Sequence, residues 1–266
     1  MRRSTPVIAE ALEPIGLEEL TGTTELLDRV DVKYVVPVET MSRVIERLRG
    51  SHRVLTIDER TRFEYWTTYF DAPELTSFRE HVQRRRRRFK CRTRHYVESG
   101  HHAFEVKLKG PRGRTLKRRM PCEPMADGPL GEPALGFLRD CLAVAYGRDL
   151  DATMVPALSV AYHRVTLAAP ELGERLTCDL TLRFGGADGR TGRLRDGLAI
   201  VESKSGDGRA AADRALLALG ARPVADCSKY CLGIALTRPD VRSNRFRPLM
   251  RRYFSPGVTR RSQGEA

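Results

Sequence analysis

Hydrophobic and polar positions alternate with a period of two in several segments of this chain, which is the pattern of a half-buried β-strand. In residues 104–109, apolar side chains alternate strictly with Glu105, Lys107 and Lys109. Other segments are apolar, aromatic or β-branched and are bounded by turn residues, and these also predict strands. The strands expected on these grounds are residues 27–36, 62–71, 89–97, 102–109, 114–121, 157–167, 174–184 and 198–203.

Apolar residues spaced three or four apart predict a smaller set of helices. In residues 132–146, Leu135, Leu138 and Leu142 follow this spacing, and Gly147 supplies the stop. The same signals predict helices at residues 6–20, 40–49 and 209–219. Because strands dominate and the helices lie between or after groups of strands, the pattern favours an α+β fold over a doubly wound parallel sheet.

Charged residues gather on one face of most of the predicted strands. Successive side chains of a strand point to opposite faces, so residues two apart share a side. Each charged face, taken alone, is explained as the wet side of an antiparallel sheet. The aligned sets are Arg29, Asp31 and Lys33; Lys90, Arg92 and Arg94; Glu105, Lys107 and Lys109; Tyr162 and Arg164; Arg175, Thr177 and Asp179; and Glu202 and Lys204.

The repetition of cationic faces across so many strands favours a closed arrangement. We expect an antiparallel β-barrel with flanking helices, in which the charged faces converge on one enclosed cavity. Two like charges about 5 Å apart repel by roughly 3 kcal/mol at an effective dielectric near 20. A bound polyanion would remove that repulsion, and arginine forks suit phosphate oxygens. The few carboxylates among the cations suit a hard divalent ion, and the combination fits phosphoryl transfer.

Composition narrows the partners and the compartment. The 266 residues carry a formal net charge of +13, which implies an anionic partner: nucleic acid, an anionic membrane surface or a phosphorylated small molecule. No stretch approaches the eighteen apolar residues of a membrane helix, so we expect a cytoplasmic protein. The six cysteines form no C-x-x-C pair and are expected to be reduced. The phosphate-binding loop G-x-x-x-x-G-K-[ST] and a strand-linked G-x-G-x-x-G are both missing, which excludes two common nucleotide-binding designs.

Eight short motifs, in order along the chain, resemble those of the VTC domain, the catalytic module of polyphosphate polymerases in the CYTH-like triphosphate tunnel superfamily. The resemblance covers about residues 10–236. It implies a tunnel domain over residues 26–236. The helical pattern before this domain predicts an N-terminal extension over residues 1–25 that packs on the barrel, and the arginine-rich, proline-containing composition after it predicts a weakly ordered basic tail over residues 237–266. The motifs are residues 27–34, 69–73, 90–96, 104–109, 156–164, 175–179, 201–204 and 228–231.

The resemblance also implies roles for individual residues. The metal ligand is expected to be Glu202, with Glu105 as a helper. The residues expected to carry the reaction are Lys33, Arg92, Arg94, Lys107, Arg164, Arg175 and Lys204. The residues expected to bind substrate are Lys90 and Lys109, which share the charged faces, together with Lys229 and one or both of Lys117 and Arg118, where the alignment is loose.

The implied reaction transfers the γ-phosphate of ATP onto a polyphosphate chain, with Mn²⁺ or Mg²⁺ as cofactor. The same residues would also serve an inorganic or nucleoside triphosphatase, because water and a terminal phosphate compete as acceptor. A non-catalytic protein that binds polyphosphate or nucleic acid is a third reading, motivated by the basic tail and by an unbroken arginine run. That run, Arg84 to Arg88, is open to three interpretations: an exposed loop, an entrance that attracts phosphate chains, or a contact with nucleic acid or membrane.

Overall fold

The protein is described by a computed structural model over residues 12–22, 30–110, 115–124 and 128–257. The chain divides into two compact units, which we describe separately. Unit 1 consists of Met1–Phe63, His163–Thr181 and Arg195–Ala225. Unit 2 consists of Glu64–Tyr162, Leu182–Leu194 and Asp226–Ala266.

The sheet of unit 1 follows the strand order β1-β3-β8-β9-β11-β2. The pairing of β1 with β3 is parallel, whereas β11 pairs antiparallel with both β9 and β2. In this register Glu202 of β11 lies between Lys33 of β2 and Thr177 of β9. The strands are β1 (Pro14–Ile15), β2 (Val30–Pro37), β3 (Arg53–Leu55), β11 (Leu198–Ser205) and the unit 1 parts of β8 (Val155–Ala169) and β9 (Glu174–Gly186).

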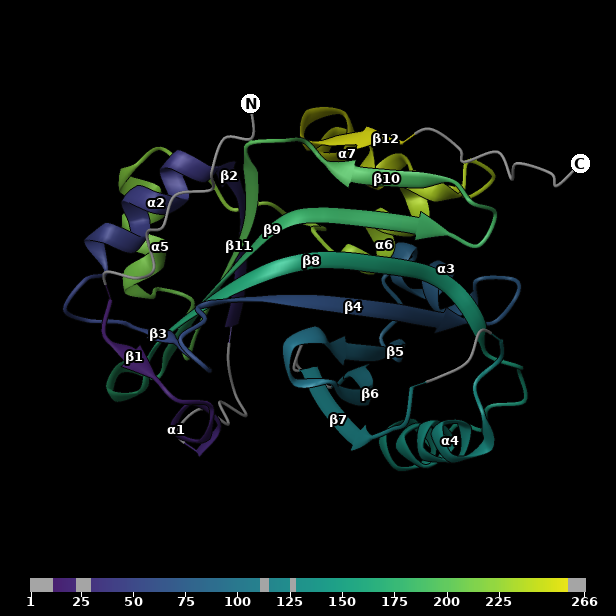
Figure 1. Ribbon diagram of the computed structural model, residues 1–266. Helices are drawn as coiled ribbons and strands as arrows, with labels where there is room; N and C mark the ends of the chain where they lie inside the picture. The colour runs from purple at the N-terminus through teal and green to yellow at the C-terminus, as the bar shows by residue number, and fades with distance from the viewer. Residues whose placement is uncertain (1–11, 23–29, 111–114, 125–127, 258–266) are drawn as a thin grey trace, which may run out of the picture. The chain divides into compact units, whose positions relative to one another are not determined.

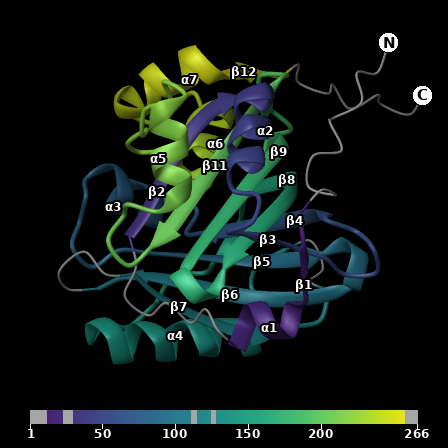
Figure 2. The same ribbon diagram turned by 90° about the vertical axis from the view of Figure 1, so that its left-hand side faces the viewer.

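Two helices of unit 1 pack on the apolar side of this sheet. These are α2 (Val38–Arg47) and α5 (Ala211–Ala218), which lie side by side next to β2 and β11 (Figures 1 and 2). Their core includes Tyr34, Val44 and Leu216, all nearly fully buried. Alternation along the strands therefore sends apolar residues toward these helices and leaves the charged residues on the other face. The short helix α1 (Leu17–Gly22) and the 3-10 turn η4 (Pro170–Leu172) complete the unit.

The sheet of unit 2 follows the order β12-β10-β9-β8-β4-β5-β6-β7. Strands β4, β5, β6 and β7 are antiparallel neighbours, and the 3-10 turn η2 (Val97–Ser99) with Gly100 at φ 64° joins β5 to β6. Glycine suits this turn because it adopts positive φ without strain. The strands that lie within unit 2 or mostly so are β4 (Arg62–Asp71), β5 (Phe89–Tyr96), β6 (His101–Lys109), β7 (Thr115–Pro121), β10 (Thr191–Leu194) and β12 (Phe254–Pro256).

The longest helix of unit 2, α4 (Glu132–Tyr146), covers the apolar side of β5 and β6. Its Leu138 and Leu142 are fully buried against a cluster that includes Phe104 and Val106. The remaining helices are α3 (Thr76–Val82), α6 (Lys229–Thr237), the 3-10 turn η5 (Asn244–Phe246) and α7 (Arg247–Tyr253).

The structure confirms an α+β fold, but the predicted closed barrel is wrong. The twelve strands belong to one open sheet, and among the described residues the path of unit 2 runs from β12 to β7 without these two strands pairing. Side-chain parity determines which residues share a face, but it does not determine whether the first and last strands meet. Repulsion between the cations is also weaker than expected, because carboxylates on the same faces pair with several of them.

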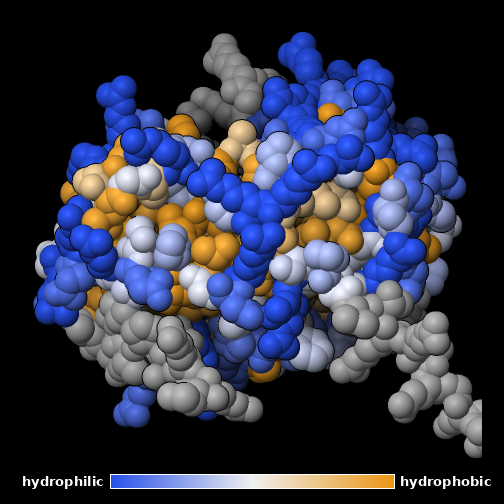
Figure 3. Space-filling view, turned by 90° about the horizontal axis from the view of Figure 1, so that it is seen from above, coloured by the Kyte–Doolittle hydropathy of each residue, from blue (hydrophilic) through white to orange (hydrophobic). Residues whose placement is uncertain are grey.

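Several predicted elements are found with nearly the expected bounds, and the two ends of the chain differ most from expectation. The helix predicted over residues 6–20 is wrong within the described residues, where the strand β1 (Pro14–Ile15) precedes the short helix α1 (Leu17–Gly22); residues 6–11 lie outside the described residues. The start of the strand predicted at residue 27 lies outside the described residues, and β2 begins at Val30. The segment predicted as a weakly ordered tail holds η5, α7 and β12, and β12 pairs with β10. Arg242, Arg247, Arg251 and Arg252 are exposed, whereas Arg238 and Arg245 are partly buried. Hydrophilic residues are numerous on the face seen from above (Figure 3). All six cysteines are free thiols.

Candidate functional site

The charged face of unit 2 is organised around one buried carboxylate, that of Glu105. Arg92 of β5 lies opposite it in register, and its Nε and Nη2 atoms lie 2.8 and 2.6 Å from Glu105 Oε2. Lys117 Nζ of β7 lies 2.5 Å from Oε1, and Arg94 Nη1 lies 3.6 Å from Oε2. Three cations therefore converge on a carboxylate that is only 2% exposed.

The protonation states of this cluster follow from its burial and its charges. Burial acts to raise the pKa of Glu105, but Arg94, Arg92 and Lys117 outweigh it and hold that pKa well below the ordinary value. Partial loss of contact with water lowers the pKa of Lys117 to about 8, although the charge of Glu105 opposes the shift. Because the charge of Glu105 is already shared among three cations, its surroundings favour a role in positioning Arg92 and Arg94 over the predicted role as a metal ligand.

Two tyrosine hydroxyls accept hydrogen bonds from the arginines that pair with Glu105. Arg92 Nη1 donates to the Tyr69 hydroxyl at 2.9 Å, and Arg94 Nη2 donates to the Tyr162 hydroxyl at 3.2 Å. The Lys229 ammonium lies 4.9 Å from the centroid of the Tyr162 ring. These contacts fix the orientation of both guanidinium groups. A site that binds an anion in one position requires donors that are fixed in this way. The sequence did not assign these tyrosines a role, although Tyr162 was placed on the same face as Arg164.

A row of lysines lies beside the Glu105 cluster. Lys90, Lys107 and Lys117 are direct neighbours in the register of β5, β6 and β7, at the separation of cross-strand pairs, about 5 Å. Lys90 Nζ donates to Ser228 Oγ at 2.9 Å, whereas Lys107 is exposed. Lys109 ends β6 opposite Thr115 and is half-buried.

The structure also separates the two candidates of β7. Lys117 shares the face of Glu105, whereas Arg118 pairs in register with Val106 and therefore belongs to the opposite face. The positive charge of Arg118 acts to lower the pKa of the Cys141 thiol in α4, although burial is the larger effect and raises that pKa. Arg118 therefore lies on the side of α4, away from the other predicted phosphate-binding residues of this unit.

The charged face of unit 1 has its own pattern of paired rows. One row consists of Lys33, Glu202 and Thr177, and the next consists of Asp31, Lys204 and Arg175. Lys204 Nζ lies 3.4 Å from Glu202 Oε1 and 3.3 Å from Thr177 Oγ1. Lys204 is only 8% exposed, so its ammonium is fixed close to the Glu202 carboxylate.

Arg164 and Arg175 are held by oxygen atoms of the same unit. Arg164 makes a bidentate ion pair with Asp179, with Nε–Oδ1 and Nη2–Oδ2 distances of 2.6 and 2.9 Å. Asp179 is fully buried, so this pair is well shielded from water. Arg175 Nη2 donates to the Leu20 carbonyl at 2.9 Å. Asp179 was not among the predicted site residues, although its alignment with Arg175 and Thr177 was the signal that could have found it.

Among the described residues of unit 1, Glu202 is the predicted ligand whose surroundings can be compared with the needs of a divalent metal. Within the parts of the chain that the structure describes, no group of three His, Cys, Asp or Glu side chains could hold an ion. Mg²⁺ and related ions are often bound through one or two carboxylates together with substrate phosphates and water. Asp179 is paired with Arg164, whereas the Glu202 side chain is 13% exposed and shares its face with Lys33 and Lys204. Glu202 therefore suits the predicted role of metal ligand.

Comparison with known proteins gives one family match and several distant structural likenesses. A VTC domain model matches residues 28–238. No curated protein shows significant similarity to the chain. The structure is similar to a Vibrio parahaemolyticus protein provisionally assigned as an adenylate cyclase, with 13% identity, coverage of 77% of this chain and 97% of that chain, and a TM-score of 0.45.

Two other solved structures show a comparable likeness. A Pyrococcus horikoshii protein is 12% identical over 77% of this chain and 97% of its own, with a TM-score of 0.43. A Hippeastrum protein, provisionally named an adenylyl cyclase and described as having a dominant triphosphatase activity, is 11% identical over 78% of this chain and 95% of its own, with a TM-score of 0.41.

None of the helices in the described parts of the chain is long and apolar enough to cross a membrane. The family match extends over both charged faces, from the strand that carries Lys33 to the helix that carries Lys229. Because the VTC domain model matches residues 28–238, which is most of the sequence, the chain belongs to the VTC domain family.

Proposed function

We propose that this protein is a metal-dependent phosphotransferase that acts on a triphosphate-bearing substrate, and that its reaction is polyphosphate synthesis from ATP. Membership of the VTC domain family supports phosphoryl transfer. The observation that carries the proposal is that arginines on both charged faces are oriented by buried carboxylates. Glu105 holds Arg92 and Arg94, and Asp179 holds Arg164.

Oriented cations are what phosphoryl transfer requires of a protein. The transferred group carries its charge on equatorial oxygens, so catalysis depends on positioning and on charge neutralisation rather than on a protein nucleophile. Cations that are already fixed need no reorganisation when that charge develops. In this proposal Arg92 and Arg94 bind phosphate oxygens on the charged face of unit 2, and Arg164 binds them on the charged face of unit 1. The lysines of each face neutralise charge on that face.

Glu202 is the residue that would hold Mn²⁺ or Mg²⁺. Such an ion, when bound, bridges phosphate oxygens and neutralises part of their charge. Lys204 lies beside Glu202 and would bind a phosphate oxygen close to the ion that Glu202 would hold. Lys33 is the cross-strand neighbour of Glu202 and binds an adjacent phosphate oxygen.

Triphosphate hydrolysis is the second candidate activity. The Lys117 side chain is 44% exposed although it contacts Glu105, so water reaches the edge of the cationic cluster. The same cations would neutralise the transferred group whether its acceptor is a phosphate chain or water. A third outcome, binding of polyphosphate or nucleic acid without turnover, requires no metal ligand.

The test incubates the protein with ATP and Mn²⁺ and separates acid-insoluble phosphate chains from orthophosphate. Acid-insoluble chains support synthesis, and orthophosphate alone supports a triphosphatase. We expect Glu202→Gln to lower turnover by more than about tenfold, since loss of even an outer partner of a metal site costs about that much.

The matched control is Glu46→Gln, which makes the same chemical change at an exposed glutamate on α2 of the same unit. It is expected to leave turnover unchanged. A fully active Glu202→Gln protein would contradict the assigned metal site. If the wild-type protein binds polyphosphate but shows no turnover, the proposed reaction is wrong and only the binding role remains.

A further inference from the structure

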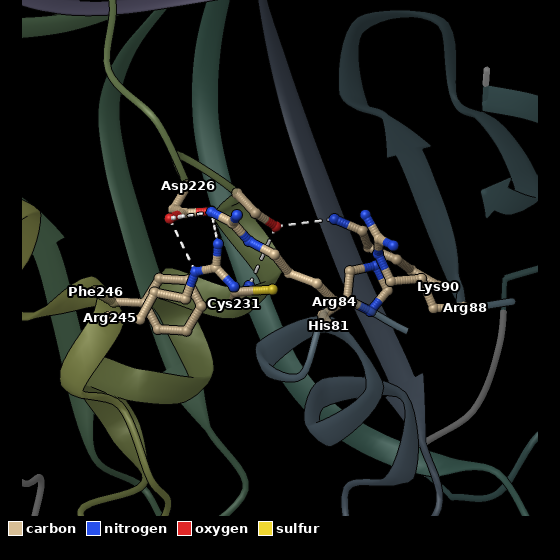
Figure 4. Close-up of a pocket in the computed structure, with 9 residues that line it drawn as sticks. His81, Arg84, Arg88, Lys90, Asp226, Cys231, Arg245 and Phe246 are labelled. Carbon is tan, nitrogen blue, oxygen red and sulfur yellow. Dashed lines mark hydrogen bonds and ion pairs between the residues drawn. The ribbon is translucent and has the colours of Figure 1, made fainter. Parts of the chain in front are cut away.

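Unit 2 contains a pocket of about 300 Å³, close to the lower limit of roughly 300–1,000 Å³ for small-molecule sites. Its walls come from α3, from the arginine run that follows α3, from β5 and from the segment around α6 and η5 (Figure 4). The pocket is lined by His81, Arg84, Arg88, Lys90, Asp226, Ser228, Cys231, Arg245 and Phe246.

Cations outnumber carboxylates in this lining by four to one. Arg84, Arg88, Lys90 and Arg245 are the cations, and Asp226 is the only lining residue that carries a carboxylate. Arg245 makes a bidentate pair with Asp226, in which both N–O distances are 2.8 Å. Arg245 therefore neutralises most of the charge of Asp226. The other cations of the lining give the pocket a positive potential.

Two of the cations are fixed, and they define one side of the pocket. Arg245 Nη1 also donates to the Val82 carbonyl at 3.1 Å, and its side chain is 19% exposed. Lys90 Nζ donates to Ser228 Oγ at 2.9 Å. These contacts hold both charges in place.

The other two cations belong to the arginine run and are held loosely. The Arg84 side chain is 70% exposed, and its Nη2 atom lies 3.7 Å from Asp226 Oδ2, beyond hydrogen-bond distance. Arg88 Nη1 donates to the carbonyl of Arg85, a neighbour in the same loop. Both guanidinium groups can exchange these contacts for stronger, charge-assisted hydrogen bonds to an anion.

His81 lies in the same pocket and contributes no competing positive charge. Its Nδ1 atom lies 2.8 Å from the Ser77 carbonyl and therefore carries the proton. Burial, followed by the charge of Lys90, lowers the pKa of His81 to about 3, so the ring is neutral near pH 7. A neutral ring beside four cations makes His81 a local reporter of any anion that enters.

We propose that this pocket is a second anion site, which binds a phosphate group through Arg84, Arg88, Lys90 and Arg245. Arginine forks match phosphate geometry, and the excess of cations suits an anion with more than one negative charge. The group belongs either to free orthophosphate or to the end of a polyphosphate chain. Lys90 is also one of the predicted substrate-binding residues, whereas Arg84, Arg88 and Arg245 were not assigned to phosphoryl transfer. Phosphate binding at this pocket is therefore tested through Arg84 and Arg88, separately from the reaction proposed above.

The test follows the His81 imidazole by NMR in the full-length protein, labelled with ¹⁵N-histidine and held at pH 7 and constant ionic strength. The His81→Gln variant identifies the signal. We expect orthophosphate or tripolyphosphate to shift the His81 signal saturably. The ligand that saturates the shift at lower concentration identifies the source of the phosphate group.

A matched pair of double variants separates the pocket from the general charge of the loop. Arg84→Gln/Arg88→Gln removes two charges that line the pocket, and Arg86→Gln/Arg87→Gln removes two charges of the same run that do not. We expect the first pair to weaken binding by at least tenfold, about the effect of one lost charge-assisted hydrogen bond. The second pair is expected to change it by less than about twofold.

Two results would overturn the proposal. One is a wild-type His81 signal that shows no saturable shift at millimolar orthophosphate or tripolyphosphate. The other is an equal loss of affinity in both double variants, which would show that the net charge of the loop acts without a built site. The thermal midpoint of each variant checks that the fold is intact.

Discussion

At the scale of single residues, burial and neighbouring charge act on titratable groups in opposite directions. Glu105 stays ionised although it is buried, because three cations surround it. His52 is 2% exposed, and its Nε2 atom lies 3.5 Å from the nearest oxygen of Glu174. Burial alone lowers the pKa of His52 to about 4. At neutral pH Glu105 is therefore negatively charged, whereas His52 is uncharged.

The neutral state of His52 predicts acid-sensitive stability. In the unfolded chain the pKa of histidine is about 6.5, so between pH 6.5 and pH 4 the unfolded state binds a proton that the folded state does not. Stability is therefore complete above pH 6.5 and falls as the pH is lowered through this range. At pH 5 the expected loss is about 2 kcal/mol from His52.

The measurement is the thermal midpoint at pH 7 and pH 5 for the wild-type protein, His52→Gln and His101→Gln. The His52→Gln protein is expected to lose less stability between the two pH values than the wild-type protein. His101 is exposed, and His101→Gln is expected to keep the wild-type pH dependence. The same pH dependence in all three proteins would contradict the role of His52.

At the scale of elements, a buried aspartate joins a strand end to two helices in unit 2. Asp71, the last residue of β4, accepts hydrogen bonds from the backbone N–H groups of Ser77 and Phe78 in the first turn of α3. It also accepts a hydrogen bond from the hydroxyl of Tyr230 in α6. Asp71 is fully buried, and these donors replace the hydrogen bonds that water would make to its carboxylate.

Removal of the Tyr230 hydroxyl is expected to weaken the attachment of α6. In Tyr230→Phe, Asp71 loses a donor in a buried site, which costs about 1–3 kcal/mol. We expect the thermal midpoint to fall by several degrees. Tyr253→Phe makes the same change at a partly exposed tyrosine of α7 and is expected to have little effect. Equal midpoints for Tyr230→Phe and the wild-type protein would show that the hydroxyl contributes nothing.

The elements also show what the sequence can predict. Strict alternation and a glycine stop placed β6 and α4 within a residue of their observed bounds. Helix α6 was missed because it is buried on nearly all sides, from Tyr230 to Thr237, so its apolar residues show no helical period. Helix α3 has only seven residues, too few for a clear period.

The candidate site could be predicted only in part, because parity gives the face of a residue but not its partners. Parity alone placed Asp31 with Lys33 on one face of β2, Arg175 with Thr177 on one face of β9, and Glu202 with Lys204 on one face of β11. The pairing of Arg92 with Glu105, by contrast, depends on the register between β5 and β6, which no local signal specifies. For the same reason the sequence could not distinguish Lys117 from Arg118, or an open sheet from a closed one.

At the scale of the whole molecule, the net charge of +13 determines how anions approach. Long-range attraction raises the rate of association and is screened by salt, with a Debye length of about 10 Å at 0.1 M and about 3 Å at 1 M. Contacts that are already formed, such as bidentate arginine–phosphate pairs, are screened less. Salt is therefore expected to act mainly on association.

We expect the association rate constant for tripolyphosphate to fall by at least about tenfold between 0.05 and 0.5 M NaCl. The dissociation rate constant is expected to change much less. Stopped-flow kinetics at each salt concentration measures both constants. An association rate constant that is independent of salt would show that the net charge has no steering role.

Strand β7 lies at one end of the sheet path of unit 2, and among the described residues it pairs with β6 alone. Its outer backbone groups are therefore a template on which a second copy could add a strand. Arg118 and Arg119 are exposed along this strand, and Pro121 at its end donates no backbone hydrogen bond. Two copies that approach each other through β7 bring like charges together. The arginines of this strand therefore oppose the self-association and aggregation to which an open sheet edge is prone.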